Sequence, residues 1–409
     1  MTNQIKVIAG GVTAAEGFMA AGITAGLKKS GKKDIAVIYC EEKSTSAACF
    51  TQNKYAAAPV IWSREHAEKG WSRAVVINSG NANACTGEQG YQNAKKMAEL
   101  TASKLPIFPD EVQICSTGII GVQLPMQIIE PGVLKAVEAL SRDGGAAAAE
   151  AIRTTDTFAK EIAVEFELDG KLVKMGGMSK GSGMIHPNMA TMLAIITTDA
   201  VITPAAFQQA LQEVVDLSFN MISVDGDTST NDTVIALASG MAHNKMIKDD
   251  ASAGYAQFSA ALKVVLVHLA KEIARDGEGA SKLLEVTVNG ALTIKDARLA
   301  ARSVVSSSLV KTAFFGNDAN WGRIVCALGY SGAEFDINLV DICIKSAAGQ
   351  FAVLKEGKDL PLDEELALKV LSEKEVITTI DFNQGMASAT AWGCDLTYDY
   401  VKINGDYRS

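Results

Sequence analysis

Short apolar runs alternate with helical patterns along most of the chain. The run Ala74–Ile77 ends in a polar turn sequence, and a helical pattern over 92–105 follows it. A segment with period-two alternation over 162–168 meets Asp169–Gly170, a dipeptide typical of tight hairpin turns. Thr203–Pro204 then supplies a helix N-cap and a first-turn proline. These recurring strand, turn and helix signals predict an α/β fold.

A second long helical pattern, over 253–275, contains an apolar run and stops at a glycine-containing stretch. Beyond it the pattern starts again with an apolar strand at Leu284–Val288 and a turn signal at Asn289–Gly290. A helical pattern over 294–306 and further strands over 337–344 come next. We interpret this restart as the beginning of a smaller C-terminal lobe.

The segment Lys174–Ala200 changes character at one peptide bond. It holds four glycines in its first ten residues, and up to Ala190 it has the composition of an irregular loop rich in glycine and methionine. From Thr191 onward it has the pattern of a buried strand, with an apolar run at Met192–Ile196. A threonine at this junction is the first candidate for chemistry.

Composition narrows the function classes. The 409 residues are 48% hydrophobic and carry a formal net charge of −9 without any basic run, which argues against nucleic acid or anionic lipid as a partner. The seven cysteines are scattered and never form a C-x-x-C pair, which argues against a disulfide framework and a zinc site. Because the N-terminal stretch lacks the pattern of a signal peptide and the cysteines suit a reducing compartment, we expect a cytoplasmic protein. The acidic charge balance favours a role on small molecules.

The glycine-rich segment does not match a known phosphate-binding loop. A P-loop needs a glycine directly before its lysine, whereas here Lys180 precedes Gly181. A dinucleotide-binding glycine loop leads into a helix, whereas this one leads into an apolar strand. Nucleotide binding is therefore not the function that this segment favours.

A threonine hydroxyl needs a base before it can act as a nucleophile, and Thr191 offers a way to supply one. Cleavage of the Ala190–Thr191 peptide would create an α-amine with a pKa of roughly 7.7 to 8, which can take the hydroxyl proton. The hydroxyl itself could attack the Ala190 carbonyl and start the cleavage, if nearby glycines and Pro187 strain that peptide. From the residues alone, Thr191 could equally be the plain start of a buried strand.

The stretch Lys180–Leu193, "KGSGMIHPNMATML", closely resembles the self-cleavage signature of the ornithine acetyltransferase (glutamate N-acetyltransferase) family of arginine biosynthesis. Six further blocks resemble the same family in the same order, so that the likeness covers nearly the whole chain: 76–90, 116–125, 223–233, 275–282, 316–324 and 400–409.

By this resemblance the protein would transfer acetyl from N-acetylornithine to glutamate, which yields ornithine and N-acetylglutamate. The acetyl group would form a covalent intermediate on Thr191, so that the exchange of one amide for another takes place in two steps. No metal and no tightly bound cofactor would be needed, and acetyl-CoA is left open as a second acetyl donor in a bifunctional enzyme. The alternative is an aminopeptidase or amidase of the same fold, which also uses an N-terminal nucleophile.

The resemblance assigns the chemistry to a few residues. Thr191 would be the nucleophile and Ala190–Thr191 the peptide that is cleaved. Thr117 and Gly118, in a "CSTGIIG" block, would supply a hydroxyl and a backbone N–H to an oxyanion hole. None of the four histidines receives a catalytic role, because they share no spacing.

The substrate contacts that the resemblance implies are spread over the chain. Lys180 would attract an amino-acid carboxylate and Glu278 the distal ammonium of ornithine. The tail departs from the family at two places, because Gly405 and Ser409 stand where alanine and threonine are usual. The full set of substrate-binding positions is Thr154 (or its neighbour Thr155), Lys180, Thr191, Glu278, Asn404 and Ser409.

The resemblance also implies a fold and an assembly. The expected fold is an N-terminal-nucleophile-like αββα sandwich over about residues 1–278, with a smaller α/β lobe over about 279–400. A tail, 401–409, would return to the active site. Cleavage would give an α chain, 1–190, and a β chain, 191–409, which would associate as an α2β2 heterotetramer.

Overall fold

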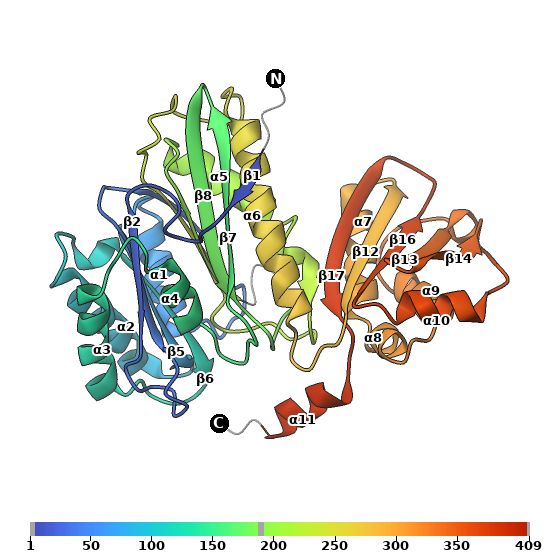
Figure 1. The fold of residues 1–409 in the computed structure, drawn as a ribbon, viewed down its shortest axis with the longest axis horizontal. Coiled ribbons are helices and arrows are strands. Elements are labelled where there is room, and N and C mark those ends of the chain that lie inside the picture. Colours follow the sequence, from blue (N-terminus) through green and yellow to red (C-terminus); the bar gives the residue numbers. More distant parts are fainter. Residues whose placement is uncertain (1–4, 187–191, 407–409) are drawn as a thin grey trace.

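The computed structural model describes residues 5–186 and 192–406, and within them three β-sheets carry the fold (Figure 1). Two sheets face each other in the N-terminal two thirds of the chain, and the third forms a C-terminal lobe. None of the described helices combines the length and the apolar character that crossing a membrane requires.

The first sheet has four strands in the order β2-β3-β5-β6. Three helices cover its outer face, where Trp62, Met97 and Val133 pack against the strands. The strands are β2 (Phe18–Ile23), β3 (Ile35–Cys40), β5 (Ala74–Asn81) and β6 (Val112–Ile119), and the helices are α1 (Ala58–Ala67), α2 (Gly87–Ala102) and α3 (Met126–Glu138). The single-turn 3-10 helix η1 (Pro109–Glu111) leads into β6.

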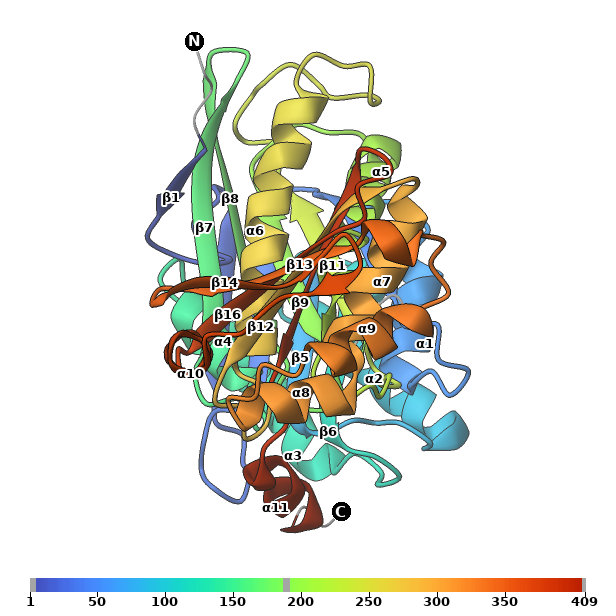
Figure 2. The same cartoon turned by 90° about the vertical axis from the view of Figure 1, so that its right-hand side faces the viewer.

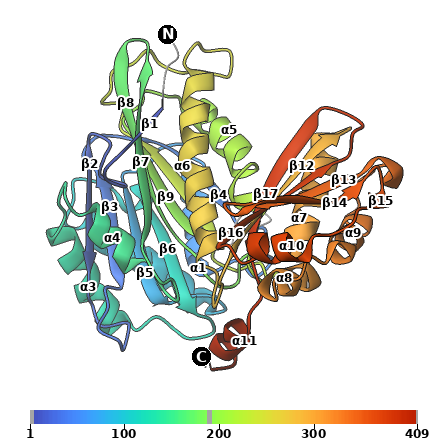
Figure 3. The same ribbon diagram turned by 45° about the vertical axis from the view of Figure 1, so that its right-hand side comes forward.

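The second sheet has six strands in the order β1-β7-β8-β9-β11-β4, and two helices cover its outer face (Figure 3). Its strands are β1 (Lys6–Ile8), β4 (Thr45–Phe50), β7 (Lys160–Leu168), β8 (Lys171–Lys180), β9 (Leu193–Thr198) and β11 (Thr233–Ala238). The helices are α5 (Pro204–Val215) and α6 (Tyr255–Arg275).

The inner faces of these two sheets share one apolar layer, in which Ile38 and Val75 of the first sheet meet Ile195 and Ile235 of the second. The short helix α4 (Gly145–Ala151) contributes its alanines to the same layer. The order helices, sheet, sheet, helices is the αββα sandwich that the sequence predicted, so the fold class is confirmed.

The C-terminal lobe is built on a seven-stranded sheet in the order β10-β17-β12-β16-β13-β14-β15 (Figure 2). Its strands are β10 (Ile222–Ser223), β12 (Leu283–Ala291), β13 (Asp341–Ser346), β14 (Gly349–Lys355), β15 (Lys358–Asp359), β16 (Glu375–Asp381) and β17 (Ala387–Cys394). Its helices are α7 (Ile294–Ser306), α8 (Ser308–Phe315), α9 (Trp321–Gly329) and α10 (Glu364–Leu371), with 3-10 turns η2 (Phe219–Met221) and η3 (Ile337–Leu339).

The last described helix, α11 (Tyr398–Asp406), leaves this lobe and lies below it in Figure 1, toward the N-terminal sandwich. The Thr397 hydroxyl donates to the Gly279 carbonyl over 2.7 Å, and the Tyr400 hydroxyl donates to Asp225 over 3.3 Å. These hydrogen bonds hold the start of the helix against the loop that follows α6 and against the segment that follows β10.

Two local predictions are confirmed because their causes are local. Asp169 and Gly170 have φ values of +51° and +74°, the geometry of a tight hairpin turn, and they join β7 to β8. The Thr203 side chain accepts a hydrogen bond from the Ala206 N–H, and Pro204 begins α5.

The expectation of an irregular loop from Lys174 to Ala190 is wrong for its first part, since β8 continues to Lys180. The glycines there serve close packing instead of loop geometry. A Cβ on Gly176 would lie 1.9 Å from the Gly11 carbonyl oxygen, and one on Gly177 would lie 2.8 Å from the end of Ile196.

The turn predicted at Asn289–Gly290 is also wrong, because β12 runs on to Ala291. Gly290 has a φ of +65°, and the pairing with β17 shifts register between Val288 and Ala291. The same positive φ at Gly290 that would suit a turn is used here in a β-bulge, and the strand continues beyond it.

Candidate active site

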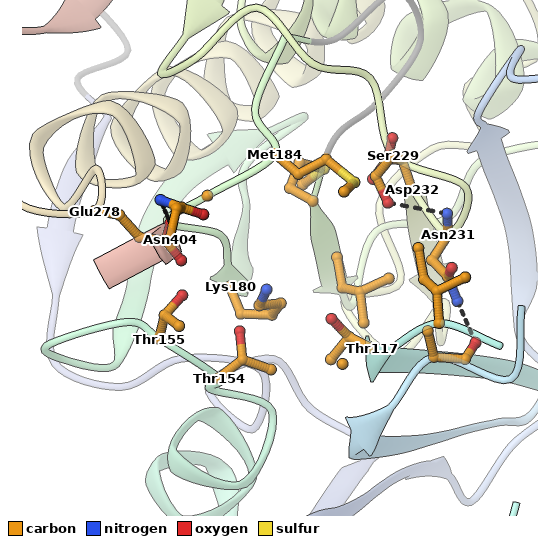
Figure 4. Close-up of a pocket in the computed structure, with 16 residues that line it drawn as sticks. Thr117, Thr154, Thr155, Lys180, Met184, Ser229, Asn231, Asp232, Glu278 and Asn404 are labelled. Carbon is orange, nitrogen blue, oxygen red and sulfur yellow. Dashed lines mark hydrogen bonds between the residues drawn. The ribbon is translucent and has the colours of Figure 1, made fainter. Parts of the chain in front are cut away.

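A cavity of about 190 Å³ lies where the ends of β6, β8, β9 and β11 meet the loop after α6 and the C-terminal helix (Figure 4). This volume is small against the sites of drug-sized ligands, about 300–1,000 Å³, and suits a metabolite. The lining residues are Ala82, Thr117, Gly118, Ile120, Thr154, Thr155, Lys180, Gly183, Met184, Met192, Leu193, Ser229, Asn231, Asp232, Glu278 and Asn404.

The cavity brings together the sequence-predicted site residues that the structure describes. They come from five separate parts of the chain, and they are Thr117, Gly118, Thr154, Lys180, Glu278 and Asn404. Thr155, the alternative to Thr154, lines the cavity as well. Ala190, Thr191 and Ser409 lie outside the described residues, so the cleavage site and the nucleophile stay predictions.

Thr117 and Gly118 lie at the end of the pairing between β5 and β6, where the register becomes irregular around Asn81. Gly118 has a φ of +134°, and a Cβ on it would lie 2.4 Å from the Gly80 carbonyl carbon. Only glycine fits this approach. In the part of the chain that the structure describes, the Thr117 hydroxyl makes no hydrogen bond, so it is available to donate one to a ligand.

A buried ion network supports one side of the cavity. The Lys160 ammonium lies 2.7 Å from an Asp156 oxygen and 2.5 Å from an Asp276 oxygen, and all three side chains are at most 3% exposed. The Asp276 carboxylate also accepts the Thr157 backbone N–H at 3.0 Å. Because each charge has a partner of opposite sign, the cluster can persist without water.

The network also holds segments that carry predicted contacts. Asp156 accepts the backbone N–H of Thr154 at 2.9 Å and that of Gly181, next to Lys180, at 2.8 Å. Burial by itself raises the pKa of the Asp156 carboxyl, but the ammonium groups of Lys180 and Lys160 outweigh it and hold that pKa well below its usual range. Asp156 is therefore an anion that holds two backbone segments that carry cavity-lining residues.

Glu278 follows α6 and reaches the cavity beside the glycine segment. Its backbone N–H donates to the Ser182 carbonyl over 2.9 Å, and a Cβ on Gly183 would lie 2.4 Å from its carboxyl group. The Asn404 amide donates to Glu278 over 2.9 Å, as Figure 4 shows. The tail residue Asn404 thus reaches the predicted ornithine-side acid.

Sequence reasoning missed a group of polar residues on the opposite side, Ser229, Asn231 and Asp232. They belong to the block 223–233, which carried the family resemblance but received no role. The Asn231 amide donates to the carbonyls of Ala82 and Ser116 over 2.6 and 2.8 Å, which ties this loop to the first sheet. The block itself was the signal that could have identified them.

Asp232 is the buried acid of this group, at 2% exposure, and its Oδ2 has no hydrogen-bond partner among the described residues. Burial raises the pKa of its carboxyl well above the usual range, and the hydrogen bond from Ser229 and the charge of Lys180 offset this only in part. Burial therefore favours the neutral, protonated form of the Asp232 carboxyl.

His186 has a structural position between the glycine segment and the C-terminal lobe. Its Nδ1 lies 3.0 Å from the Ser223 hydroxyl and its Nε2 lies 3.1 Å from the Arg302 guanidinium. Burial, with the Arg302 charge, lowers the pKa of His186 to about 4. The imidazole is neutral at physiological pH and does not line the cavity.

The described residues contain no group of three or more His, Cys, Asp or Glu side chains that could hold a metal ion.

Comparison with known proteins gives consistent matches. The sequence profile of the ArgJ family matches residues 19–409. The chain is 55% identical over 404 residues to the arginine biosynthesis bifunctional protein ArgJ of Symbiobacterium thermophilum, covering 98% of this chain and 99% of that one. It is 52% identical over 405 residues to the protein of the same name from Caldanaerobacter subterraneus subsp. tengcongensis, covering 99% and 100%.

Among solved structures, the arginine biosynthesis bifunctional protein ArgJ from Bacillus halodurans is 46% identical with a TM-score of 0.50. The match covers 53% of this chain and 100% of that chain. With a family match over most of its length and relatives above 50% identity across nearly all of it, this chain belongs to the ArgJ family.

Proposed function

We propose that this protein is an acyltransferase of arginine biosynthesis that transfers acetyl from N-acetylornithine to glutamate. The observation that carries the proposal is the cavity, which gathers the six described residues that the family resemblance named from distant parts of the sequence. The names of the relatives, arginine biosynthesis bifunctional protein ArgJ, support the pathway.

The nucleophile in this proposal is Thr191. The two residues that follow it, Met192 and Leu193, line the cavity at the start of β9. The free α-amine of Thr191 would take the hydroxyl proton while the oxygen attacks the acetyl carbonyl. Thr117 and Gly118 would then stabilise the oxyanion of each tetrahedral intermediate, a contribution of about 2.7–4 kcal/mol for one such donor.

The α-amine requires cleavage at Ala190–Thr191. The Bacillus halodurans chain supports this step, because it is matched over its whole length yet covers only 53% of this chain. Residues 191–409 make up a similar share. We therefore propose an α chain, 1–190, and a β chain, 191–409, that stay together because both contribute strands to the second sheet. Two such pairs would associate as α2β2.

Substrate binding follows from the charges around the cavity. Lys180 would pair with an amino-acid carboxylate, and Glu278, held by Asn404, would pair with the distal ammonium of ornithine. Thr154 or Thr155 would hydrogen-bond the substrate, and Ser409 would complete the site from the tail. In Figure 4, Glu278, Asn404 and Thr155 are grouped at one side of the view, away from Asn231 and Asp232.

The word "bifunctional" in the names of the relatives supports a second activity, and acetyl-CoA as an alternative acetyl donor for glutamate is the form we propose. No tightly bound cofactor enters the proposed reaction. A cytoplasmic location accords with the seven unpaired cysteines, none of which forms a disulfide in the described chain.

Intact mass spectrometry of the purified protein, with and without N-acetylornithine, tests the proposal directly. We expect two chains broken at Ala190–Thr191, an acetyl adduct on the second chain, and loss of that adduct when glutamate is added. Thr191→Ala should leave one uncut chain. An adduct that water removes as fast as glutamate does would favour an amidase instead, and an uncut, unacetylated wild-type chain would refute the function.

A further inference from the structure

Three ionisable residues line the cavity among those described, and the proposed function uses only two of them. Lys180 and Glu278 bind substrate charges, which leaves Asp232 without a role. Building on the proposed function, we propose that Asp232 is a further catalytic residue, a proton carrier that supplies a proton to the departing amine of the acetyl donor and recovers one from the amine of the acceptor.

The backbone places Asp232 beside Met192, the first described residue after the proposed cleavage site. β11 runs parallel to β9 with Thr233 opposite Leu193, and the Thr233 N–H donates to the Met192 carbonyl over 2.9 Å. Asp232 precedes Thr233, so it lies at the N-terminal ends of both strands, next to Met192. The reaction proposed above takes place at this end of the sheet.

The side chain is available for a ligand. Buried carboxyl oxygens in proteins nearly always have a hydrogen-bond partner, and Asp232 Oδ2 has none among the described residues although its residue is 2% exposed. The neighbouring Asn231 amide, in contrast, is fully used by two backbone carbonyls. An unpaired buried oxygen in a cavity wall is a place where a reacting group can be bound.

The proton state suits the task. Burial keeps the pKa of the Asp232 carboxyl well above its usual range, so the group enters the reaction with its proton. An amine is a poor leaving group until its nitrogen is protonated, and a positioned acid typically contributes 10²–10⁴-fold to such a step. The α-amine of Thr191 already receives one proton from the hydroxyl, so a separate acid serves the leaving nitrogen.

The proton balance closes over both half-reactions. In the first, Thr191 Oγ bonds to the acetyl carbon and its proton moves to the α-amine. The bond from the acetyl carbon to the ornithine nitrogen then breaks, and that nitrogen takes the Asp232 proton. The Thr191 ammonium then carries one positive charge and the Asp232 carboxylate one negative charge. In the second, the glutamate amine attacks and gives a proton to Asp232, and Thr191 Oγ takes back its own as it leaves.

The test compares two acetyl donors on two variants. Asp232→Asn keeps the shape but cannot give up a proton, and Asp199→Asn is the matched control. Asp199 is also a buried aspartate, 4% exposed, with a pKa raised by burial, but it follows the far end of β9 and does not line the cavity. The donors are N-acetylornithine, whose amine must be protonated, and p-nitrophenyl acetate, whose phenolate leaves without a proton.

We expect Asp232→Asn to slow acetylation of Thr191 by N-acetylornithine about 10²–10⁴-fold and to change acetylation by p-nitrophenyl acetate less than about tenfold. Asp199→Asn should change the rate of acetylation by the two donors to the same extent. Equal slowing of both donors by Asp232→Asn, or no slowing, overturns the role of Asp232. Wild-type protein that neither donor acetylates refutes the proposed function itself, which is a different result.

Self-cleavage is read in the same proteins, because it also expels a nitrogen, that of Thr191. If Asp232→Asn remains uncut while Asp199→Asn is cut, Asp232→Glu, which restores a carboxyl group, is the deciding variant. Recovery of cleavage by Asp232→Glu supports the proton role, and its absence overturns it.

Discussion

The two sides of the cavity shift the pKa of a buried aspartate in opposite directions. The network side is held by Asp156, Lys160 and Asp276, which do not line the cavity themselves but bind segments that do. Every charge of this network is paired, and the pKa of Asp156 lies below its usual range. On the proton side, formed by Asn231 and Asp232, no ion pair to the acid is found among the described residues, and the pKa of Asp232 lies well above its usual range.

Burial is common to both sides, so burial alone does not decide the charge of a carboxyl group. A cation at contact distance does, because it favours the ionised form more than burial penalises it. The paired side is suited to holding backbone segments still, whereas the unpaired side is suited to moving a proton. Changes on the network side should therefore affect folding and binding, and changes on the proton side should affect chemistry.

The largest effect should come from breaking the network. Lys160→Met leaves two buried carboxylates without their shared cation, and we expect the free energy of unfolding to fall by about 3–5 kcal/mol. Urea unfolding measures it. Lys6→Met is the control, because Lys6 pairs with Glu165 at the surface and should cost less than about 1 kcal/mol. Similar losses in the two variants would mean that the network is no stronger than a surface pair.

The next effect tests chemistry across the cavity. Thr117→Ala removes the proposed oxyanion donor, and kcat/KM for acetyl transfer should fall by roughly one to three orders of magnitude, mostly in kcat. Steady-state kinetics on fully cleaved enzyme measures it, with the cleaved fraction read by mass. An unchanged kcat/KM would remove Thr117 from the oxyanion hole.

A smaller effect tests binding beside the network. Glu278→Gln should weaken the reaction with N-acetylornithine by roughly 1.5–3 kcal/mol, mostly in KM, because a charge-assisted contact to the distal ammonium is lost. N-acetylnorvaline, which has no distal amine, is the control donor and should respond little. Self-cleavage should persist. Equal losses with both donors would place Glu278 in the chemistry or the fold.

The smallest effect is the pH dependence of stability, and it has opposite signs for Asp232 and Asp156. The folded pKa of Asp232 is raised, so its contribution to stability is complete below the unfolded value of about 3.9 and is lost as pH rises above it. The folded pKa of Asp156 is lowered, so its contribution is present above about 3.9 and is lost as pH falls below it.

Urea unfolding from about pH 4 to 7 measures the Asp232 part. Relative to Asp232→Asn, the wild-type protein should lose stability as pH rises, by at most about 1.4 kcal/mol per unit. The compared quantity is the unfolding free energy of the wild-type protein minus that of Asp232→Asn. If this quantity stays constant or grows with pH, Asp232 is ionised when buried, and the contrast with Asp156 fails.

Several features follow from the sequence by itself because their causes are local or familial. The Thr203 cap and the Asp169–Gly170 hairpin depend on residues within a few positions of one another. The αββα fold, and six of the residues that line the cavity, followed from blocks that resemble a family along nearly the whole chain. Such blocks name positions even when they say nothing of the distances between them.

Other features were decided only by the tertiary structure, because they depend on neighbours far apart in the sequence. Gly176 and Gly177 belong to a strand because the Gly11 backbone and Ile196 press against them. Asp156 and Asp232 are both aspartates in polar segments, and no local pattern tells them apart. Two lysines hold one as an anion, whereas burial without a cation in contact leaves the other its proton. That difference exists only once the sheets have brought the charges together.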